Sequence, residues 1–296
     1  MDTRDPDLLG ARRLGFLAGA PIGAALAHRT AALSDPVGIR AEIDSGIRPL
    51  APPAGRRFAA VALGDALIEE LMSGGVDLRR LARRWTDWQE ADGFDVDPGL
   101  AAALSHLREF DAPADQLDVT GPAALLAALP AALAASSPRS MVSGAFHTAR
   151  LVDPDPDSGL AAVAVVLAAA RFLEGQRDFI AEVLGLLRSN NAPPELFDRY
   201  AAIAREPRRV ATPPRGNNAS ATEVALWALR VAEHQPRGVE ALEAMVSAGG
   251  VSPAAGAVLG ALLGARDGIE HWPAAWRDGA GEDVVLRTAL AATLAA

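Results

Sequence analysis

Apolar positions along the chain recur every three to four residues and almost nowhere alternate with polar ones, a pattern typical of helices rather than strands. Ala, Leu, Arg and Glu dominate these segments, and all four favour the helical conformation. The pattern therefore predicts an all-α protein. Candidate helices cover residues 8–27, 36–46, 58–73, 78–90, 98–109, 121–135, 140–150, 158–174, 177–188, 194–204, 221–233, 238–247, 253–267 and 282–295.

Capping signals mark several of the expected helix starts. A carboxylate or hydroxyl side chain before a proline provides an N-cap followed by a residue already suited to the first helical position. A Ser followed three residues later by Glu has the spacing of a capping box. The first signal occurs at Asp35-Pro36, Asp97-Pro98 and Ser252-Pro253, and the second at Ser220 and Glu223.

The expected helix at 253–267 carries glycines at 256, 260 and 264. Residues four apart lie on one face of a helix, so this face has no side chains and another backbone or a ligand can approach it closely. In an all-α protein, the spacing predicts a central helix that is packed tightly on all sides. We accordingly interpret the uncharged run 248–265 as a buried helix rather than a membrane span.

Composition excludes several kinds of chemistry. The 296 residues include 28 basic side chains, all Arg, and 37 acidic ones, which gives a net charge of −9. With no Cys, disulfides, thiolate metal sites and a Cys nucleophile are impossible. With no Lys, there is no Schiff-base or P-loop lysine. The negative charge, without a basic cluster, predicts no binding to nucleic acid and no docking on an anionic membrane.

The expected organisation is a single domain over 1–296, since the Pro- and Gly-rich loops at 48–56 and 206–219 are too short to separate two domains. Arg12 and Arg13 precede an uncharged run, which resembles an export signal. However, the residues before them are acidic and glycines interrupt the run. We therefore expect a cytoplasmic protein.

Residues 249–268, GGVSPAAGAVLGALLGARDG, resemble the C-terminal signature of the ADP-ribosylglycohydrolase family, GGDTDTNAAIAGALLGAxYG. The Trp that follows this signature in the family is matched by Trp272 and Trp276. Weaker similarities in the same order cover most of the chain, at 15–27 (GFLAGAPIGAALA), 58–71, 121–130 (GPAALLAALP) and 151–156 (LVDPDP). The resemblance implies a compact all-α bundle that hydrolyses glycosidic bonds to ADP-ribose with two Mg²⁺ ions.

The same resemblance indicates that the metal ligands are gone. The family supplies carboxylates from its TDDT and DTDT motifs, and Mg²⁺ requires such oxygen ligands. The last motif falls on residues 251–254, where only Ser252 keeps a side-chain oxygen, and TDDT falls on 59–62, AAVA. We therefore expect no bound Mg²⁺. The positions expected to line the family's cleft are Ala20, Ala59, Ala60, Val61, Pro122, Val251, Ser252 and Pro253.

Other side chains offer weak alternatives. The family's His falls on Asp153, and His147 lies shortly before it, so a His–Asp pair for acid–base work is conceivable. A lone His on an Ala-rich helix is more often structural, and the acids at 153–157 are more often helix caps than calcium ligands. The acidic run that includes Asp95 and Asp97 is expected to be a solvated face and loop.

Three functional interpretations remain open. The first is a pseudoenzyme or binding module that takes an ADP-ribose-like or other small molecule, or a protein partner. The second is a metal-independent enzyme that uses the altered cleft, and it requires a deep pocket with an inward-pointing acid. The third is an active hydrolase with displaced ligands, which requires at least three converging carboxylates. A filled cleft would favour the first.

Overall fold

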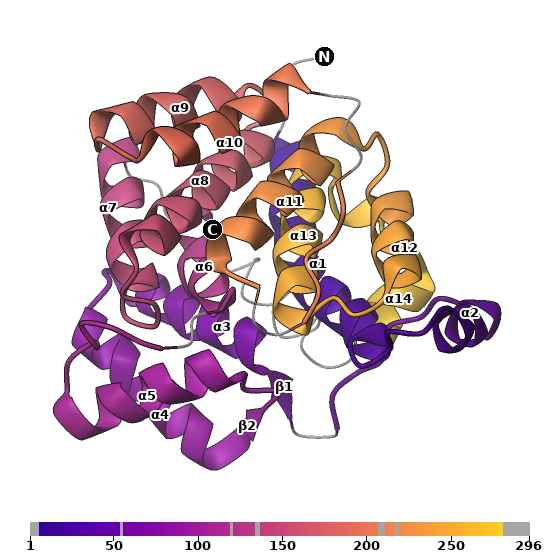
Figure 1. Cartoon of the computed structure of the whole chain (residues 1–296), viewed down its shortest axis with the longest axis horizontal. Coiled ribbons are helices and arrows are strands. Elements are labelled where there is room, and N and C mark those ends of the chain that lie inside the picture. Colours follow the sequence, from indigo (N-terminus) through magenta and orange to yellow (C-terminus); the bar gives the residue numbers. More distant parts are fainter. Residues whose placement is uncertain are drawn as a thin grey trace.

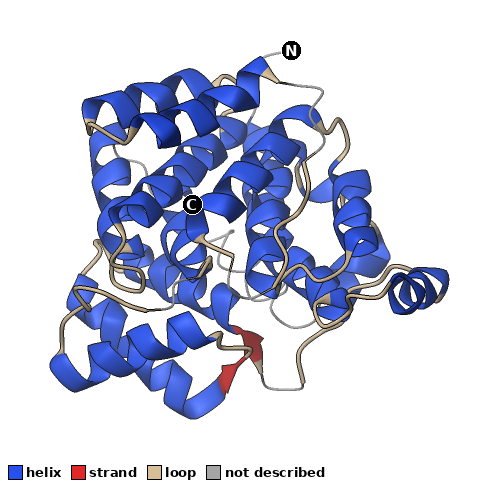
Figure 2. Cartoon of the chain, in the orientation of Figure 1, coloured by secondary structure: helices blue, strands red, loops and turns tan. Residues whose placement is uncertain are grey.

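The computed structural model describes residues 6–53, 56–118, 121–133, 137–206, 211–216 and 219–280. Helices make up nearly all of the regular structure there, as expected, with one two-stranded parallel sheet (Figure 2). The elements are α1 (Pro6–Thr30), α2 (Pro36–Asp44), β1 (Arg57–Phe58), α3 (Ala59–Met72), α4 (Leu78–Asp92), β2 (Gly93–Phe94), α5 (Pro98–Phe110), α6 (Ala123–Ala128), η1 (Leu129–Leu133), α7 (Pro138–Ala149), α8 (Pro156–Leu173), α9 (Phe179–Ser189), α10 (Pro194–Arg205), α11 (Ala221–His234), α12 (Gly238–Ala248), α13 (Pro253–Asp267), η2 (Ile269–His271) and α14 (Ala274–Gly279).

Helices α1 and α13 lie side by side in the interior and run antiparallel (Figure 1). Their contact faces are glycines, and a Cβ atom built on any of these glycines would come closer than 3.0 Å to the backbone of the other helix. Side chains are therefore excluded from this contact, which confirms the close approach predicted for residues 256, 260 and 264. The facing pairs are Gly15 with Gly264, Gly19 with Gly260, and Gly23 with Gly256.

Helix α8 is the other central helix. It packs against α6, α7, α9, α11 and α13, and most of its side chains are buried. By length and composition α8 is apolar enough to cross a membrane, but 78% of that window is buried inside the fold. A helix that is apolar on all sides is what the core of a large helical protein requires. The outer helices α9 and α10 cover one end, and α4 and α5 the opposite end (Figure 1).

The capping signals are confirmed. Asp35 accepts a hydrogen bond from the N–H of Gly38, and Asp97 accepts one from the N–H of Leu100 at 2.9 Å. Ser220 and Glu223 form the reciprocal capping box at the start of α11. Such caps contribute about 1 kcal/mol each.

The prediction of one continuous α-helix over 121–135 is wrong in its second half. The α-helix ends at Ala128 and continues as the tighter η1 turn, which contains Pro130. Proline lacks the N–H that an α-helix needs at this position, so the chain changes its hydrogen-bond pattern there. The short η2 and α14 segments were not expected, and the helix expected at 282–295 lies outside the described residues.

The glycine contact predicts the effect of a single methyl group. In Gly260→Ala the new Cβ would overlap the backbone of Gly19, so α1 and α13 must separate. We expect the free energy of unfolding to fall by about 3 kcal/mol or more, as for severe overpacking. Denaturant unfolding followed by circular dichroism measures this change.

The matched control is Gly144→Ala in α7, where a new Cβ would have no atom within 4 Å outside its own helix turn. This substitution should stabilise the protein by roughly 0.5–1 kcal/mol, because alanine has the higher helix propensity. Equal unfolding midpoints for the two variants would show that the α1–α13 contact does not exclude side chains.

Candidate functional site

The segment that precedes α13 is fixed against the end of α1. The N–H of Gly250 donates to the carbonyl oxygen of Thr30 at 2.9 Å. Ser252 is the N-cap of α13, and its Oγ accepts a hydrogen bond from the N–H of Ala255 at 3.2 Å. The hydroxyl of Ser252 is therefore already engaged in holding the helix start.

The structure brings together three of the expected cleft positions. Pro122, Ser252 and Pro253 line one cavity with a volume of about 10 Å³. Ala20 lines a second cavity of the same volume, between α1, α3 and α6. A volume of this size holds a single water molecule at most. The cleft expected from the resemblance is thus nearly filled by side chains.

The other expected cleft positions lie in the core. Val61 and Val251 are fully buried, and Ala59 is 2% exposed. None of the three lines either small cavity. Ala60 belongs to α3, but its side chain lies outside the described residues.

Two carboxylates that we expected to be solvated line the first cavity instead. Asp95 and Asp97 follow β2 and face Pro122, Ser252 and Pro253. Asp97 also caps α5, as expected. The backbone of Asp95 is in the left-handed region, with φ of 60°, which Asp and Asn tolerate better than most residues. This turn directs the chain from β2 into the cavity wall.

Burial changes the titration of both carboxyl groups. Burial and the neighbouring charge of Asp97 raise the pKa of Asp95 to about 7. Burial also raises the pKa of Asp97, although the N–H groups of Leu100 and Gly99 partly offset this effect. Asp95 can therefore hold or release a proton near neutral pH, which is the range a general acid or base requires.

A small aromatic cluster holds the Asp95 turn in place. Strand β1 pairs with β2 so that Phe58 lies opposite Phe94, and their ring centroids are 5.8 Å apart. His28, near the end of α1, packs edge-on against both rings at 5.4 and 5.8 Å. Burial lowers the pKa of His28, which favours its neutral form. In the sequence, the available sign of this arrangement was that Asp95 directly follows the aromatic residue Phe94. The strands that position both residues have two residues each, which is too short to recognise from a sequence pattern.

The residues at this site do not fit a dinuclear magnesium centre. Two Mg²⁺ ions need several carboxylates, whereas the cavity offers Asp95, Asp97 and the engaged hydroxyl of Ser252. Within the described residues, no group of three or more His, Asp or Glu side chains is arranged to hold a metal ion. The side chains that line this cavity therefore do not provide the oxygen ligands of a dinuclear magnesium site.

The two weaker catalytic candidates occupy different environments. His147 is exposed on α7 and lines a cavity of about 410 Å³. Asp153 is 1% exposed, and burial raises its pKa. Asp153 accepts a hydrogen bond from the N–H of Asp155 at 3.1 Å, and Asp155 caps α8, so this acidic segment acts as a helix start. No hydrogen bond or ion pair joins His147 to Asp153 in the described part of the chain.

Three further side chains, those of Asp65, Trp272 and Trp276, are buried in the fold. Asp65 on α3 is 1% exposed and lies 3.6 Å from the guanidinium of Arg57. Asp65 lines neither small cavity. Trp272 and Trp276 stack on each other with centroids 6.3 Å apart, and both are buried. They contribute to packing.

The raised pKa of Asp95 predicts a pH dependence of stability. A carboxyl group with a raised pKa binds its proton more tightly in the folded state, so its contribution is present at low pH. This contribution is lost as pH rises from about 4 to about 7. Asn mimics the protonated acid, so Asp95→Asn should gain stability relative to the wild type over this interval. Urea unfolding at a series of pH values measures the difference.

Asp77 provides a control of opposite sign. The N–H groups of Arg80 and Arg79 donate to this cap of α4 and lower its pKa. Asp77→Asn should therefore lose stability relative to the wild type as pH rises toward about 4, and the difference should stay constant above that pH. Parallel pH curves for Asp95→Asn and the wild type would contradict the assignment of Asp95 as a half-buried acid with a raised pKa.

Comparisons with known proteins identify the family. The family model described as ADP-ribosylglycohydrolase matches residues 5–296. A solved structure named "ADP-ribosylglycohydrolase-related protein complex" superimposes with a TM-score of 0.76 and 20% sequence identity, over 97% of this chain and 98% of that one, which shows a shared fold. No curated protein matches the sequence significantly. Because the family model spans nearly all of the sequence, this chain belongs to the ADP-ribosylglycohydrolase family.

Proposed function

We propose that this protein is a pseudoenzyme of the family, which has lost Mg²⁺-dependent hydrolysis of ADP-ribosyl bonds and acts by binding. The observation that carries the proposal is which side chains occupy the family's cleft at the start of α13. Pro253 lines the small cavity there, Val251 is buried in the core, and Ser252 caps the helix. Moving a dication from water to such a surface is strongly unfavourable.

The available space supports the same proposal. A cleft that accepts a nucleotide-sized ligand usually has a volume of several hundred Å³. The two cavities at the expected cleft positions measure about 10 Å³ each. Buried side chains of α1, α6 and α13 fill the rest, and they belong to the core. A substrate could enter only if these helices moved apart.

The proposed mode of action is recognition of a small molecule, of ADP-ribose-like or other chemistry, or of a protein partner. The net charge of −9 and the absence of Lys disfavour a polyanionic partner such as nucleic acid or an anionic membrane. The proposed location is the cytoplasm.

Calorimetric titration tests the loss of metal-dependent activity. Wild-type protein titrated with Mg²⁺, and with ADP-ribose in the presence and absence of Mg²⁺, should show no metal binding and no metal-dependent affinity for ADP-ribose. An ADP-ribosylated peptide incubated with protein and Mg²⁺ should release no more ADP-ribose than a buffer blank.

A catalytically active member of the family, run in parallel, controls for substrate quality. The double variant Asp95→Asn with Asp97→Asn tests whether these two carboxylates bind metal. Stoichiometric Mg²⁺ binding that the double variant abolishes, together with release of ADP-ribose, would refute the proposal.

A second candidate function rests on Asp95. Its pKa of about 7 and its position beside Asp97 suit metal-independent acid–base catalysis in the altered cleft. This candidate expects release of ADP-ribose from the peptide in the presence of a chelator, with a bell-shaped or sigmoidal pH profile near neutrality. Asp95→Asn should abolish that release. Activity that is unchanged in Asp95→Asn would eliminate the candidate.

A further inference from the structure

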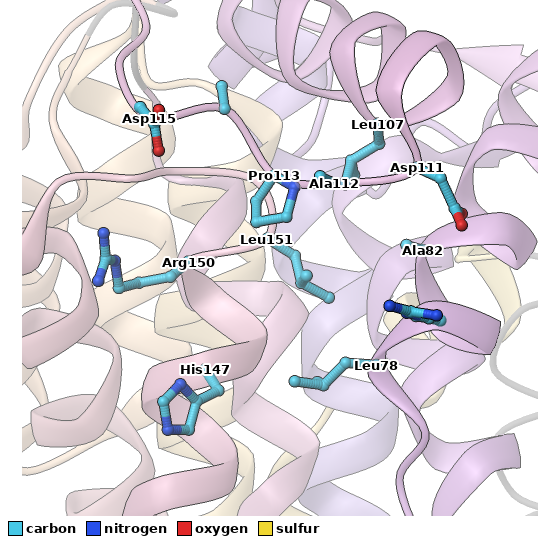
Figure 3. Close-up of a pocket in the computed structure, with 12 residues that line it drawn as sticks. Leu78, Ala82, Leu107, Asp111, Ala112, Pro113, Asp115, His147, Arg150 and Leu151 are labelled. Atoms are coloured by element: carbon cyan, nitrogen blue, oxygen red, sulfur yellow. The ribbon is translucent and has the colours of Figure 1, made fainter.

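A larger cavity lies away from the family's cleft, between α4, the end of α5 and the end of α7. Its volume is about 410 Å³, which is within the range of small-molecule sites. Figure 3 shows Leu78 and Ala82 of α4 on one side, and His147 of α7 with Arg150, the residue that follows α7, on the other. The segment that follows α5 crosses between them.

This cavity is separate from the positions that resemble the catalytic cleft. Helix α5 connects the two places, because Asp97 caps its start in the small cleft cavity and Leu107 near its end lines the larger one. Ten residues of helix span about 15 Å. A ligand in the larger cavity would therefore not depend on what happens to the metal site.

The floor of the cavity is apolar. Leu107, Leu151 and Ala114 are between 5% and 9% exposed, and the ring of Pro113 lies beside Leu151 (Figure 3). Leu78 adds a half-buried side chain from the opposite wall. A ligand that covers this floor would remove apolar surface from water, which favours binding by roughly 25 cal/mol per Å².

Two arginines on the rim, Arg79 and Arg150, form no ion pair with a carboxylate in the described residues. No carboxylate lies within 4.0 Å of the guanidinium of Arg79 or of Arg150 among the described residues. By contrast, Arg80 on the same helix is held by Glu70 at 2.5 Å. Arg150 donates a hydrogen bond from its Nε to the carbonyl oxygen of Pro154 at 3.2 Å, and its Cζ lies 5.8 Å from the centroid of the Phe146 ring. Its two terminal nitrogens donate no hydrogen bond to another described residue.

The acidic residues on the rim are not paired with these arginines in the described part of the chain. Asp111 is paired with Arg83, which lies outside the cavity lining, at 3.3 Å. The lining holds two arginines and two aspartates, so its formal charge is zero when His147 is neutral, and it becomes +1 when Arg83, the partner of Asp111, is counted with it. A carboxylate bound at the rim can therefore pair with an arginine that no aspartate of the rim engages.

We propose that this cavity binds a small organic carboxylate with an apolar body. The hydrocarbon part lies on Leu107, Pro113 and Leu151, and the carboxylate accepts hydrogen bonds from the rim arginines. Arginine suits this task because its planar fork matches the two carboxylate oxygens. His147 stands next to the bound anion and reports its presence.

Octanoate and octan-1-ol are the probes, since they share a body and differ in charge. In calorimetric titrations, octanoate should bind at least about tenfold more tightly than octan-1-ol. The double variant Arg79→Gln with Arg150→Gln should weaken octanoate binding by about tenfold and leave octan-1-ol unaffected. The control Arg40→Gln with Arg237→Gln changes the net charge equally at exposed positions outside the cavity and should bind octanoate like the wild type.

Two further measurements place the ligand. Ala112 is exposed and lines the cavity, so Ala112→Phe should block octanoate without disturbing the core. In NMR spectra, octanoate should shift the imidazole signals of His147, which are identified by their loss in His147→Gln, and leave those of His234 in place. His234 is bonded to the carbonyl oxygen of Ile203 on the far helices.

Several results would overturn the proposal. These are equal affinity for octanoate and octan-1-ol, octanoate binding that is unchanged in the cavity arginine variant, or His147 signals that stay fixed at saturating octanoate. The absence of both heat and His147 shifts would also overturn it. None of these outcomes depends on whether the protein hydrolyses ADP-ribosyl bonds.

Discussion

The backbone contact between α1 and α13 is the constraint on which the rest of the fold depends. Three glycine pairs let the two helices approach until main-chain atoms touch, and no side chain fits at these positions. This pair forms the centre around which α8, α11 and α12 pack. It also fixes the end of α1 beside the start of α13, where Gly250 is hydrogen-bonded to Thr30.

The glycine contact does not depend on the chemistry at the start of α13. The glycines are required sterically, since any side chain there would force the central helices apart. At the start of α13, Val251 is buried and Ser252 supplies the cap. Under the proposed function, hydrocarbon stands at a buried place where carboxylates would need compensating partners, so packing does not oppose the proposed change.

Charged side chains lie in two different settings at the two ends of α5. Asp95 lies half-buried beside the start of α13, in a cavity whose wall includes Pro122, Pro253 and Ala254, and burial raises its pKa. The rim of the larger cavity holds Arg79 and Arg150, which have no carboxylate within 4.0 Å in the described residues. The two places are about one helix length apart.

Sequence alone determined the helical class, most helix boundaries, the caps at Asp35, Asp97 and Ser252, and the family, because periodicity, capping and glycine spacing are local properties. It missed the change at Pro130 from α-helix to η1, and it placed Asp95 in solvent. Tertiary structure decided the neighbours of Asp95, the filling of the cleft and the cavity that His147 lines. These features join segments far apart in the chain, and burial depends on such long-range packing, which no local pattern encodes.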